Sequence, residues 1–476
     1  MREKIERLIE MAKRAAEVIK TAKKIRIISH YDADGISAAA IIAKALLKED
    51  KPFHITFLKQ LRTEDIERLK AEQNDIVMFL DMGAGLLDAL SKFENVIVCD
   101  HHQPQGEAKN ILHINPVLTD IIEDVSGSGV AYLIARAISS ENQELAELAV
   151  IGAIGDSQMG SVGPEWGLFG LNREILKDAE NAGMIKIKKG LRLWGRITRP
   201  LYKALAYSVD PFIPGITGSE SGALQFLQEI GIEIKKGEQW TTLDNLSIEE
   251  QRKLADEIIK ERIRGGQTNP EWIFGDVYEL VKRQQKDANE FATLINACGK
   301  MGKAWLGLSL CINNPVDEDI YAIIEAYRKE IGKALDWITK NKPFKETDKA
   351  VYLLAGDAIS EHVISNITSI LSRSYFEKPI FSFVKTEDGN IKISARASNG
   401  NLKEVVSLAA KAIGGEGGGH AKAAGAIIPS GTENVFIENV EKLLILNNQK
   451  QNLDKVEYAR GKEKVERKGL VHYISI

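Results

Sequence analysis

Short apolar runs that end in acidic or imidazole side chains recur through the first third of this chain. Residues 95–99 form one such run, and an Asp-His-His sequence follows it directly. Three other runs lead to the same residue types, and the side chains concerned are His30, Asp32, Asp34, Asp81, Asp100, His101, His102 and Asp156. Three of the four runs are typical of buried strands. Because the carboxyl ends of parallel strands meet at one edge of a sheet, the pattern predicts that these side chains cluster there.

A cluster of carboxylates and imidazoles is typical of metal-dependent phosphoester hydrolysis. In such sites two divalent ions, about 3.5–4 Å apart, stabilise the attacking and the leaving oxygen. Carboxylate oxygens with added imidazole favour manganese, with magnesium and cobalt as alternatives. Each aspartate alone could be an ordinary cap or turn residue. Acids at the ends of four separate segments favour a site, since a cation would remove their mutual repulsion.

Composition restricts the class of protein. The chain has 476 residues, a net charge of −4 and a charged fraction of 27%, which suits a soluble globular protein of about two or three domains. It contains no apolar run of membrane-spanning length and no signal-peptide core. The three cysteines form no paired-ligand pattern. We therefore expect a cytoplasmic protein, and the slight acidity does not exclude a nucleic-acid partner, which needs only local basic patches.

The alternation of strand-like and helical segments predicts an α/β protein with two lobes. Residues 1–200, which begin with an amphipathic helix, should form a domain around a mainly parallel sheet. Residues 201–345 are mostly helical by period, with a capping box at Ser247. Residues 346–446 should form a smaller α/β domain, and residues 447–476 a polar tail.

The second domain carries a possible phosphate-binding sequence. Gly417, Gly418 and Gly419 precede His420, and consecutive glycines let backbone amides approach a phosphate because no Cβ is in the way. Arg396, on a strand-like segment, could add a bidentate contact. A glycine run alone is also typical of a flexible turn, so the pattern gains weight only from its place in a separate domain.

Together these motifs resemble the DHH phosphoesterase superfamily with its DHH-associated C-terminal domain. The match covers about residues 25–160 and 350–430, and the segments that carry it are 32–35, Asp81, 100–102, Asp156 and 417–425. Within the superfamily the chain most resembles the archaeal RecJ-like single-strand exonucleases, including the GINS-associated nuclease.

The resemblance implies a role for each residue of the cluster. One ion is expected to be held by Asp34, Asp81, His101 and Asp156, and the other by Asp32 together with a bridging Asp81. His102 is expected to contact the scissile phosphate, and Asp100 to orient a histidine ligand. Whether His30 is a ligand of the second ion is left open. Many superfamily members have a histidine four residues before the first aspartate of this motif, whereas His30 lies two residues before Asp32.

The implied activity is hydrolysis of single-stranded nucleic acid to mononucleotides by a metal-dependent exonuclease acting in replication or repair, with DNA and 5′-to-3′ polarity favoured. The helical insert is either a brace or a module that docks the GINS complex. Two alternatives stay open: an RNA exonuclease or short-oligonucleotide phosphodiesterase, and a replication scaffold with incidental nuclease activity.

Overall fold

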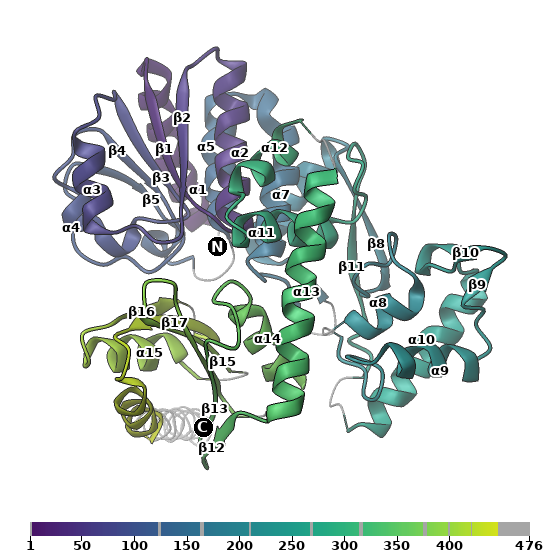
Figure 1. Cartoon of the computed structure of the whole chain (residues 1–476). Helices are drawn as coiled ribbons and strands as arrows, with labels where there is room; N and C mark the ends of the chain where they lie inside the picture. The colour runs from purple at the N-terminus through teal and green to yellow at the C-terminus, as the bar shows by residue number, and fades with distance from the viewer. Residues whose placement is uncertain are drawn as a thin grey trace, which may run out of the picture. The chain divides into compact units, whose positions relative to one another are not determined.

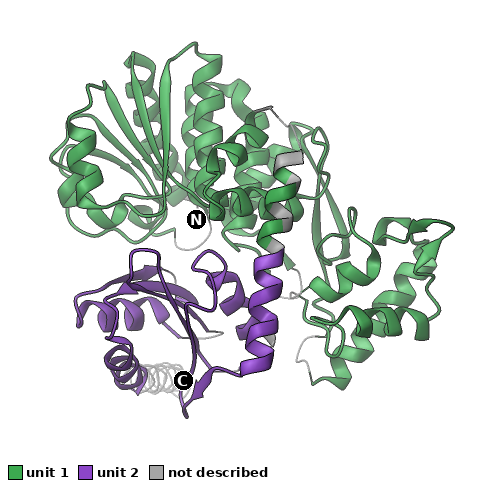
Figure 2. Cartoon of the chain, viewed as in Figure 1, with its two compact units in different colours: residues 1–327 green, residues 328–476 purple. Residues whose placement is uncertain are grey.

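The computed structural model describes residues 2–121, 125–161, 166–208, 211–266, 270–313, 318–374, 378–397, 400–419 and 421–445. The chain divides into two compact units, Met1–Tyr327 and Arg328–Ile476 (Figure 2). Each unit has its own main sheet and its own core. Within the described part of the chain, no helix is both long and apolar enough to cross a membrane.

The main sheet of unit 1 has five strands in the order β2-β1-β3-β4-β5, and all neighbouring strands are parallel. Its strands are β1 (Ile25–His30), β2 (Phe53–Leu58), β3 (Ile76–Leu80), β4 (Val96–Cys99) and β5 (Ile111–Ile114). The strand β3 is buried along its whole length, as expected of a strand with both faces covered. The parallel sheet predicted from the sequence is thus confirmed.

Helices cover both faces of this sheet (Figure 1). Alternate strand residues face opposite layers: Met78 packs with one set of helices and Phe79 with the other. The first layer contains α1 (Arg2–Thr21), α2 (Ala33–Lys48), α5 (Gly127–Ile138), α6 (Ala146–Gly155) and α7 (Gly170–Asn181). The second contains α3 (Thr63–Lys70) and α4 (Leu87–Leu90). A short pair, β6 (Gly160–Ser161) and β7 (Trp166–Gly167), lies between α6 and α7 in the sequence.

The expected helical insert is divided by its packing. β8 (Ile185–Leu191) pairs antiparallel with β11 (Phe274–Leu280), and the segment between them has a separate core. This segment contains α8 (Leu201–Tyr207), α9 (Glu220–Glu229), β9 (Lys235–Lys236), β10 (Gln239–Trp240) and α10 (Ile248–Arg264). The capping box at Ser247 is confirmed.

The later helices of the expected insert belong to the first core. Buried residues of α11 (Ala288–Lys300) and α12 (Ala304–Asn313) pack with α2 and α6 in the hydrophobic core of unit 1. The long helix α13 (Glu318–Asn341) follows them. Residues 201–345 are therefore mostly helical, as predicted, but they do not form one separable body; the exact domain boundaries stay predictions.

Unit 2 is built on a six-stranded mixed sheet in the order β12-β13-β14-β15-β17-β16. Its strands are β12 (Phe344–Glu346), β13 (Val351–Gly356), β14 (Ile380–Lys385), β15 (Ile391–Arg396), β16 (Glu416–Gly419) and β17 (Ala423–Ile428). The helices are α14 (Ile364–Ser374) and α15 (Leu402–Lys411), and α15 packs in the unit's apolar core. The second α/β domain is thus confirmed, whereas the tail expected at 447–476 lies outside the described residues.

Candidate metal centre

The predicted acids and imidazoles meet at the carboxyl edge of the parallel sheet in unit 1. β1 ends at His30, and Asp32 then caps α2, where its side chain accepts a hydrogen bond from the Gly35 amide. Asp81 directly follows β3 and has a φ of 55°, a left-handed conformation that aspartate tolerates better than most residues. Asp156 follows a helix rather than a strand: it is the C-cap residue of α6.

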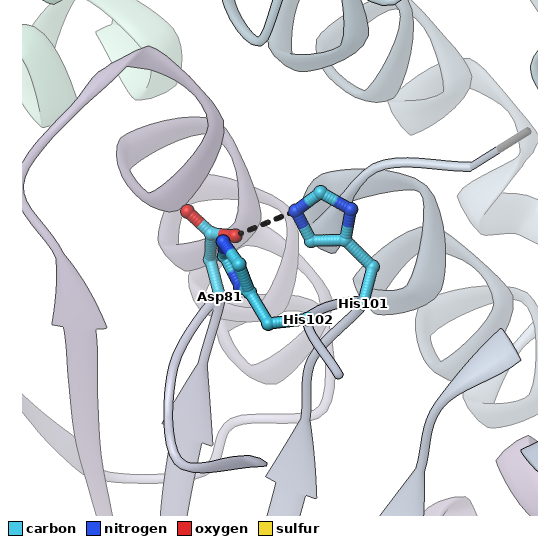
Figure 3. A group of neighbouring side chains, drawn as sticks. All are labelled: Asp81, His101 and His102. Carbon is cyan, nitrogen blue, oxygen red and sulfur yellow. Dashed lines mark ion pairs between the residues drawn. The ribbon is translucent and has the colours of Figure 1, made fainter. Parts of the chain in front are cut away.

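His101 lies among three carboxylates from separate segments of the chain. Its Nε2 atom is 3.3 Å from Asp81 Oδ1, 3.7 Å from Asp156 Oδ2 and 3.8 Å from Asp34 Oδ2. Figure 3 shows the Asp81–His101 pair with the His102 ring beside it. Asp34, Asp81 and His101 are buried. This geometry brings together the four residues expected to hold one ion.

Asp81 also takes part in a second group through its other oxygen. His30 Nδ1 lies 3.4 Å from Asp81 Oδ2 and 3.0 Å from Asp32 Oδ1. Potential metal-ligand atoms in His30, Asp32 and Asp81 therefore lie close enough to surround one ion, as do those of Asp34, His101 and Asp156. Asp81 thus stands between two groups, and the structure places His30 in one of them.

The electrostatics of the cluster favour a bound cation. Burial and the carboxylates of Asp81 and Asp156 raise the pKa of Asp34 to about 8. Burial also raises the pKa of Asp156, to about 6, although the charge of His101 opposes this shift. Burial disfavours charge on His101, but Asp81, Asp156 and Asp34 outweigh this effect and raise its pKa to about 10. Without a cation, the cluster therefore holds protons that a metal ion would displace.

The ligand set fits divalent metal ions. Asp81 Oδ1 is buried and accepts no hydrogen bond from the described residues, even though His101 is near. Such an atom is costly unless a cation occupies its free side. Carboxylate oxygens with one imidazole in each group could hold a divalent metal ion.

A helix end that the sequence analysis missed fixes Asp34. Its carboxylate accepts hydrogen bonds from the amides of Gly127 (2.7 Å) and Ser128 (3.0 Å) in the first turn of α5, a favourable place for a negative charge. A Cβ at Gly127 would lie 2.7 Å from Asp81 Oδ1. The Gly-Ser-Gly sequence at 127–129 was the available signal, but only the fold shows what it touches.

Asp100 orients His102 rather than the side chain of His101. Its Oδ1 atom lies 2.7 Å from His102 Nδ1 and accepts hydrogen bonds from the amides of His101 and His102. Burial disfavours its charge, but the His102 ring, the charge of His101 and a hydrogen bond from the Ala84 amide outweigh this effect and hold the pKa of Asp100 well below its usual range. An ionised Asp100 therefore fixes the His102 ring with Nδ1 toward Asp100, and the His102 side chain is 39% exposed.

A lysine from α11 also borders the cluster, and the sequence analysis missed it. Lys300 Nζ donates a hydrogen bond to the Tyr31 hydroxyl (2.9 Å) and lies 4.6 Å from the centre of that ring. Its charge also favours the ionised form of Asp32. Lys300 is 268 positions after Asp32 in the sequence, so no local pattern connects the two.

The residues predicted in unit 2 lie at one end of its sheet. Arg396 pairs with Ala423, and Gly419 pairs with Ala424, so they flank the first residues of β17. Gly417, Gly418 and Gly419 form an edge strand rather than an open turn. Arg396 Nε donates to Ser369 Oγ at 2.9 Å, and His420 lies outside the described residues.

Comparison with known families matches three parts of the chain. Residues 24–154 match the N-terminal domain of the DHH family, residues 193–272 the DHH-CID domain, and residues 347–446 the DHHA1 domain. An uncharacterized protein of Methanocaldococcus jannaschii is 31% identical over 464 residues, which cover 93% of this chain and 99% of that protein. The single-stranded-DNA-specific exonuclease RecJ of Thermus thermophilus is 31% identical over 243 residues, 46% of this chain and 35% of RecJ.

Solved structures share the fold. RecJ from Thermus thermophilus in complex with Mn²⁺ has a TM-score of 0.56 and 21% identity, over 92% of this chain and 54% of that one; its Mg²⁺ complex has a TM-score of 0.50 and 20% identity, over 92% and 52%. CDC45 from Entamoeba histolytica has a TM-score of 0.62 and 14% identity, over 92% and 98%. The matched families and relatives show that this chain belongs to the DHH phosphoesterase superfamily, as a RecJ-like member.

Proposed function

We propose that this protein is a metal-dependent exonuclease that hydrolyses single-stranded nucleic acid to mononucleotides, with DNA and 5′-to-3′ polarity favoured. The observation that carries the proposal is the position of Asp81, whose two oxygens face two different groups of potential metal ligands. This is the arrangement expected of a carboxylate that bridges two ions. The RecJ structures named above were solved with Mn²⁺ or Mg²⁺, and we propose Mn²⁺ as the preferred ion here.

The contacts of the candidate ligands support a role for each of them. Asp34, Asp81, His101 and Asp156 hold one ion, and His30, Asp32 and Asp81 hold the other. Ions in these positions supply positive charge to the phosphate oxygens and lower the pKa of a water molecule. The hydrogen bonds from Gly127 and Ser128 keep the Asp34 carboxylate in place.

His102 and Lys300 act on the phosphate itself. With Nδ1 directed at Asp100, His102 presents Nε2 as a hydrogen-bond donor to a phosphate oxygen, and the ionised Asp100 favours the charged ring. A hydrogen bond to the Tyr31 hydroxyl holds the Lys300 ammonium near the cluster. There it adds a positive charge that would attract a phosphodiester. These two groups balance a site that otherwise consists largely of carboxylates.

Unit 2 supplies a phosphate-binding surface in this proposal. Arg396 gives a planar guanidinium that suits a phosphate. The outer edge of β16 leaves backbone groups of Gly417, Gly418 and Gly419 unpaired with another strand in the described sheet, and His420 is proposed to contact the same phosphate.

Digestion of end-labelled strands tests the activity. We expect Mn²⁺-dependent release of mononucleotides from single-stranded DNA, little digestion of a blunt duplex, and loss of activity in chelator that Mn²⁺ restores. Labels at either end report the polarity. RNA digested faster than DNA, or cleavage restricted to very short strands, would support the alternative substrates; full activity after removal of divalent ions would contradict the metal mechanism.

The DHH-CID segment is proposed to dock the GINS complex at the replication fork, as the resemblance to GINS-associated nucleases implies. Residues 193–272 can be excised at one point because Leu191 and Phe274, on either side, are partners across an antiparallel pair. The excision also removes Arg196, which forms a buried ion pair with Asp287 at the start of α11, so Asp287→Asn belongs in the excised chain. A two-residue Asn-Gly turn would close the gap. Deletion through residue 313 would instead remove α11 and α12 from the core of unit 1.

Calorimetric titration with GINS would test this assignment. We expect the intact chain to bind and the excised chain to lose binding while it keeps its metal ligands. Binding that survives the excision would place the interface elsewhere. Absence of binding by the intact chain would return the segment to a structural role.

A further inference from the structure

Trp305 is the most exposed aromatic side chain among the described residues, with 59% of its surface accessible. It lies in the first turn of α12, whose residues Leu306 and Leu310 are buried in the core of unit 1. The inward residues of the helix thus provide its packing without Trp305. Its exposed indole offers an apolar face on which a planar ring could stack.

The turn before Trp305 is attached to the loop that carries the metal ligands. Gly299 packs so tightly against the Tyr31 carbonyl oxygen that a Cβ there would collide with it. Lys300 is hydrogen-bonded to the Tyr31 hydroxyl, and the Tyr31 ring packs edge-on against His30, with 5.0 Å between ring centroids. The path from His30 to Lys300 is therefore a chain of direct contacts.

Trp305 follows Lys300, the last residue of these contacts, by five positions in the sequence. Five residues can span at most about 18 Å, so its Cα lies within that distance of the Lys300 Cα. The chain turns back between them, since the Lys303 amide donates to the Cys298 carbonyl, which shortens the separation further. A second contact, between Gly307 of α12 and Ile36 of α2, joins the same helix to the one that carries Asp34.

The chain segment that carries Trp305 is basic. Residues 297–313 contain two lysines, Lys300 and Lys303, and no acidic residue. The Lys303 side chain is exposed next to Trp305. An exposed indole two residues from an exposed lysine matches the general design of single-strand binding, in which bases stack on aromatic rings and lysines neutralise the backbone.

We infer that Lys303 and Trp305 form a binding platform for a single strand whose end lies at the metal cluster. Trp305 stacks on a base, and Lys303 contacts a neighbouring phosphate. The inference rests on the proposed nuclease function and extends it, because stacking on an exposed base would favour single strands over a closed duplex. A protein partner for the same surface is the alternative outcome of the test.

The test measures equilibrium binding of the full-length chain in the Asp81→Asn background, so that bound strands are not cut. Two fluorescent strands of equal length are compared: oligodeoxythymidylate and a strand whose sites are abasic. Trp305→Ala should raise the Kd for oligodeoxythymidylate about tenfold and leave the Kd for the abasic strand nearly unchanged. Trp305→Phe should restore most of the affinity.

Two further variants separate stacking from charge. Lys303→Ala should weaken binding of both strands by similar factors and reduce the salt dependence, because it removes a phosphate contact. Trp240→Ala is the matched control: Trp240 is also an exposed tryptophan beside a lysine, Lys235 at 4.3 Å, but it lies in the DHH-CID segment. It should bind both strands as the parent does.

Unchanged affinity of Trp305→Ala for oligodeoxythymidylate would overturn the inference and favour a protein partner. An equal loss on both strands would also overturn it, because stacking requires a base. Neither result would affect the nuclease proposal, which digestion of end-labelled strands tests separately. If the intact chain neither binds nor digests single strands, both the nuclease proposal and the platform fail.

Discussion

The cluster of candidate metal ligands in unit 1 and the Arg396 end of the unit 2 sheet differ in how the fold assembles them and in their charge. The cluster gathers carboxylates from distant segments, and their burial, together with their mutual repulsion, raises the pKa of Asp34 and Asp156. The unit 2 surface needs only two strand pairings to place Arg396 and Gly419 on either side of β17. In the proposed mechanism the first arrangement needs bound cations, whereas the second carries the positive charge of Arg396. We therefore expect changes in the cluster to abolish activity and changes in unit 2 to weaken substrate binding.

Asp81→Asn should give the largest effect, a loss of hydrolysis by at least about 10³-fold, because the residue takes part in both ligand groups. Asparagine keeps the volume and removes the charge, so the fold should persist, as circular dichroism can verify. Asp256→Asn, on the exposed surface of α10, is the matched control and should retain full activity. An Asp81→Asn protein as active as this control would contradict the two-metal proposal.

His102→Ala should reduce kcat by about 10²-fold while Mn²⁺ binding remains, because the ring is proposed to act on the phosphate. Asp100→Asn should lower kcat in the same direction, since the amide cannot replace the charge that fixes Nδ1. Rates and bound manganese measured on the same samples would separate the two roles. Loss of metal in His102→Ala would instead make His102 a ligand, which its proximity to Asp81 and His101 also permits.

Arg396→Ala should raise KM about tenfold and leave kcat and metal content nearly unchanged, because it removes one charge-assisted phosphate contact. Lys392→Ala is the matched control, since it removes a cation from the same strand. Steady-state kinetics on single strands would compare the two variants. Depleted manganese with normal strand affinity in Arg396→Ala would overturn the assignment.

The smallest expected effect is the pH dependence of Mn²⁺ affinity. The raised pKa values of Asp34 and Asp156, and that of His101, mean that the metal-free cluster is partly protonated at pH 7. Binding of Mn²⁺ requires the deprotonated forms, so affinity should rise with pH between about 6 and 10, and protons should be released. Calorimetry in buffers of different ionisation enthalpy measures this release. A heat of binding independent of the buffer would contradict it.

The comparison also shows what the sequence could predict. Asp81, Asp100 and the residues near Asp32 follow strands whose apolar pattern is local, so their meeting at one sheet edge could be inferred. The same holds for the strand that carries Arg396. In each case the signal lies within about ten residues of the side chain concerned.

The remaining features depend on tertiary packing. The contacts of Gly127 with Asp81 and of Lys300 with Tyr31 join segments that no local pattern connects. The glycine run gave no sign that its backbone pairs with β17 as an edge strand. Similarly, helical periodicity did not reveal that α11 and α12 join the core of unit 1.

The most direct test of the central claim is a Mn²⁺ titration of the metal-free protein, followed by electron paramagnetic resonance. If Asp81 bridges two ions, the intact chain should bind two Mn²⁺ and show the spectrum of an exchange-coupled pair, and Asp81→Asn should lose that coupling. A single uncoupled ion at saturation, or an unchanged coupled pair in Asp81→Asn, would contradict the account.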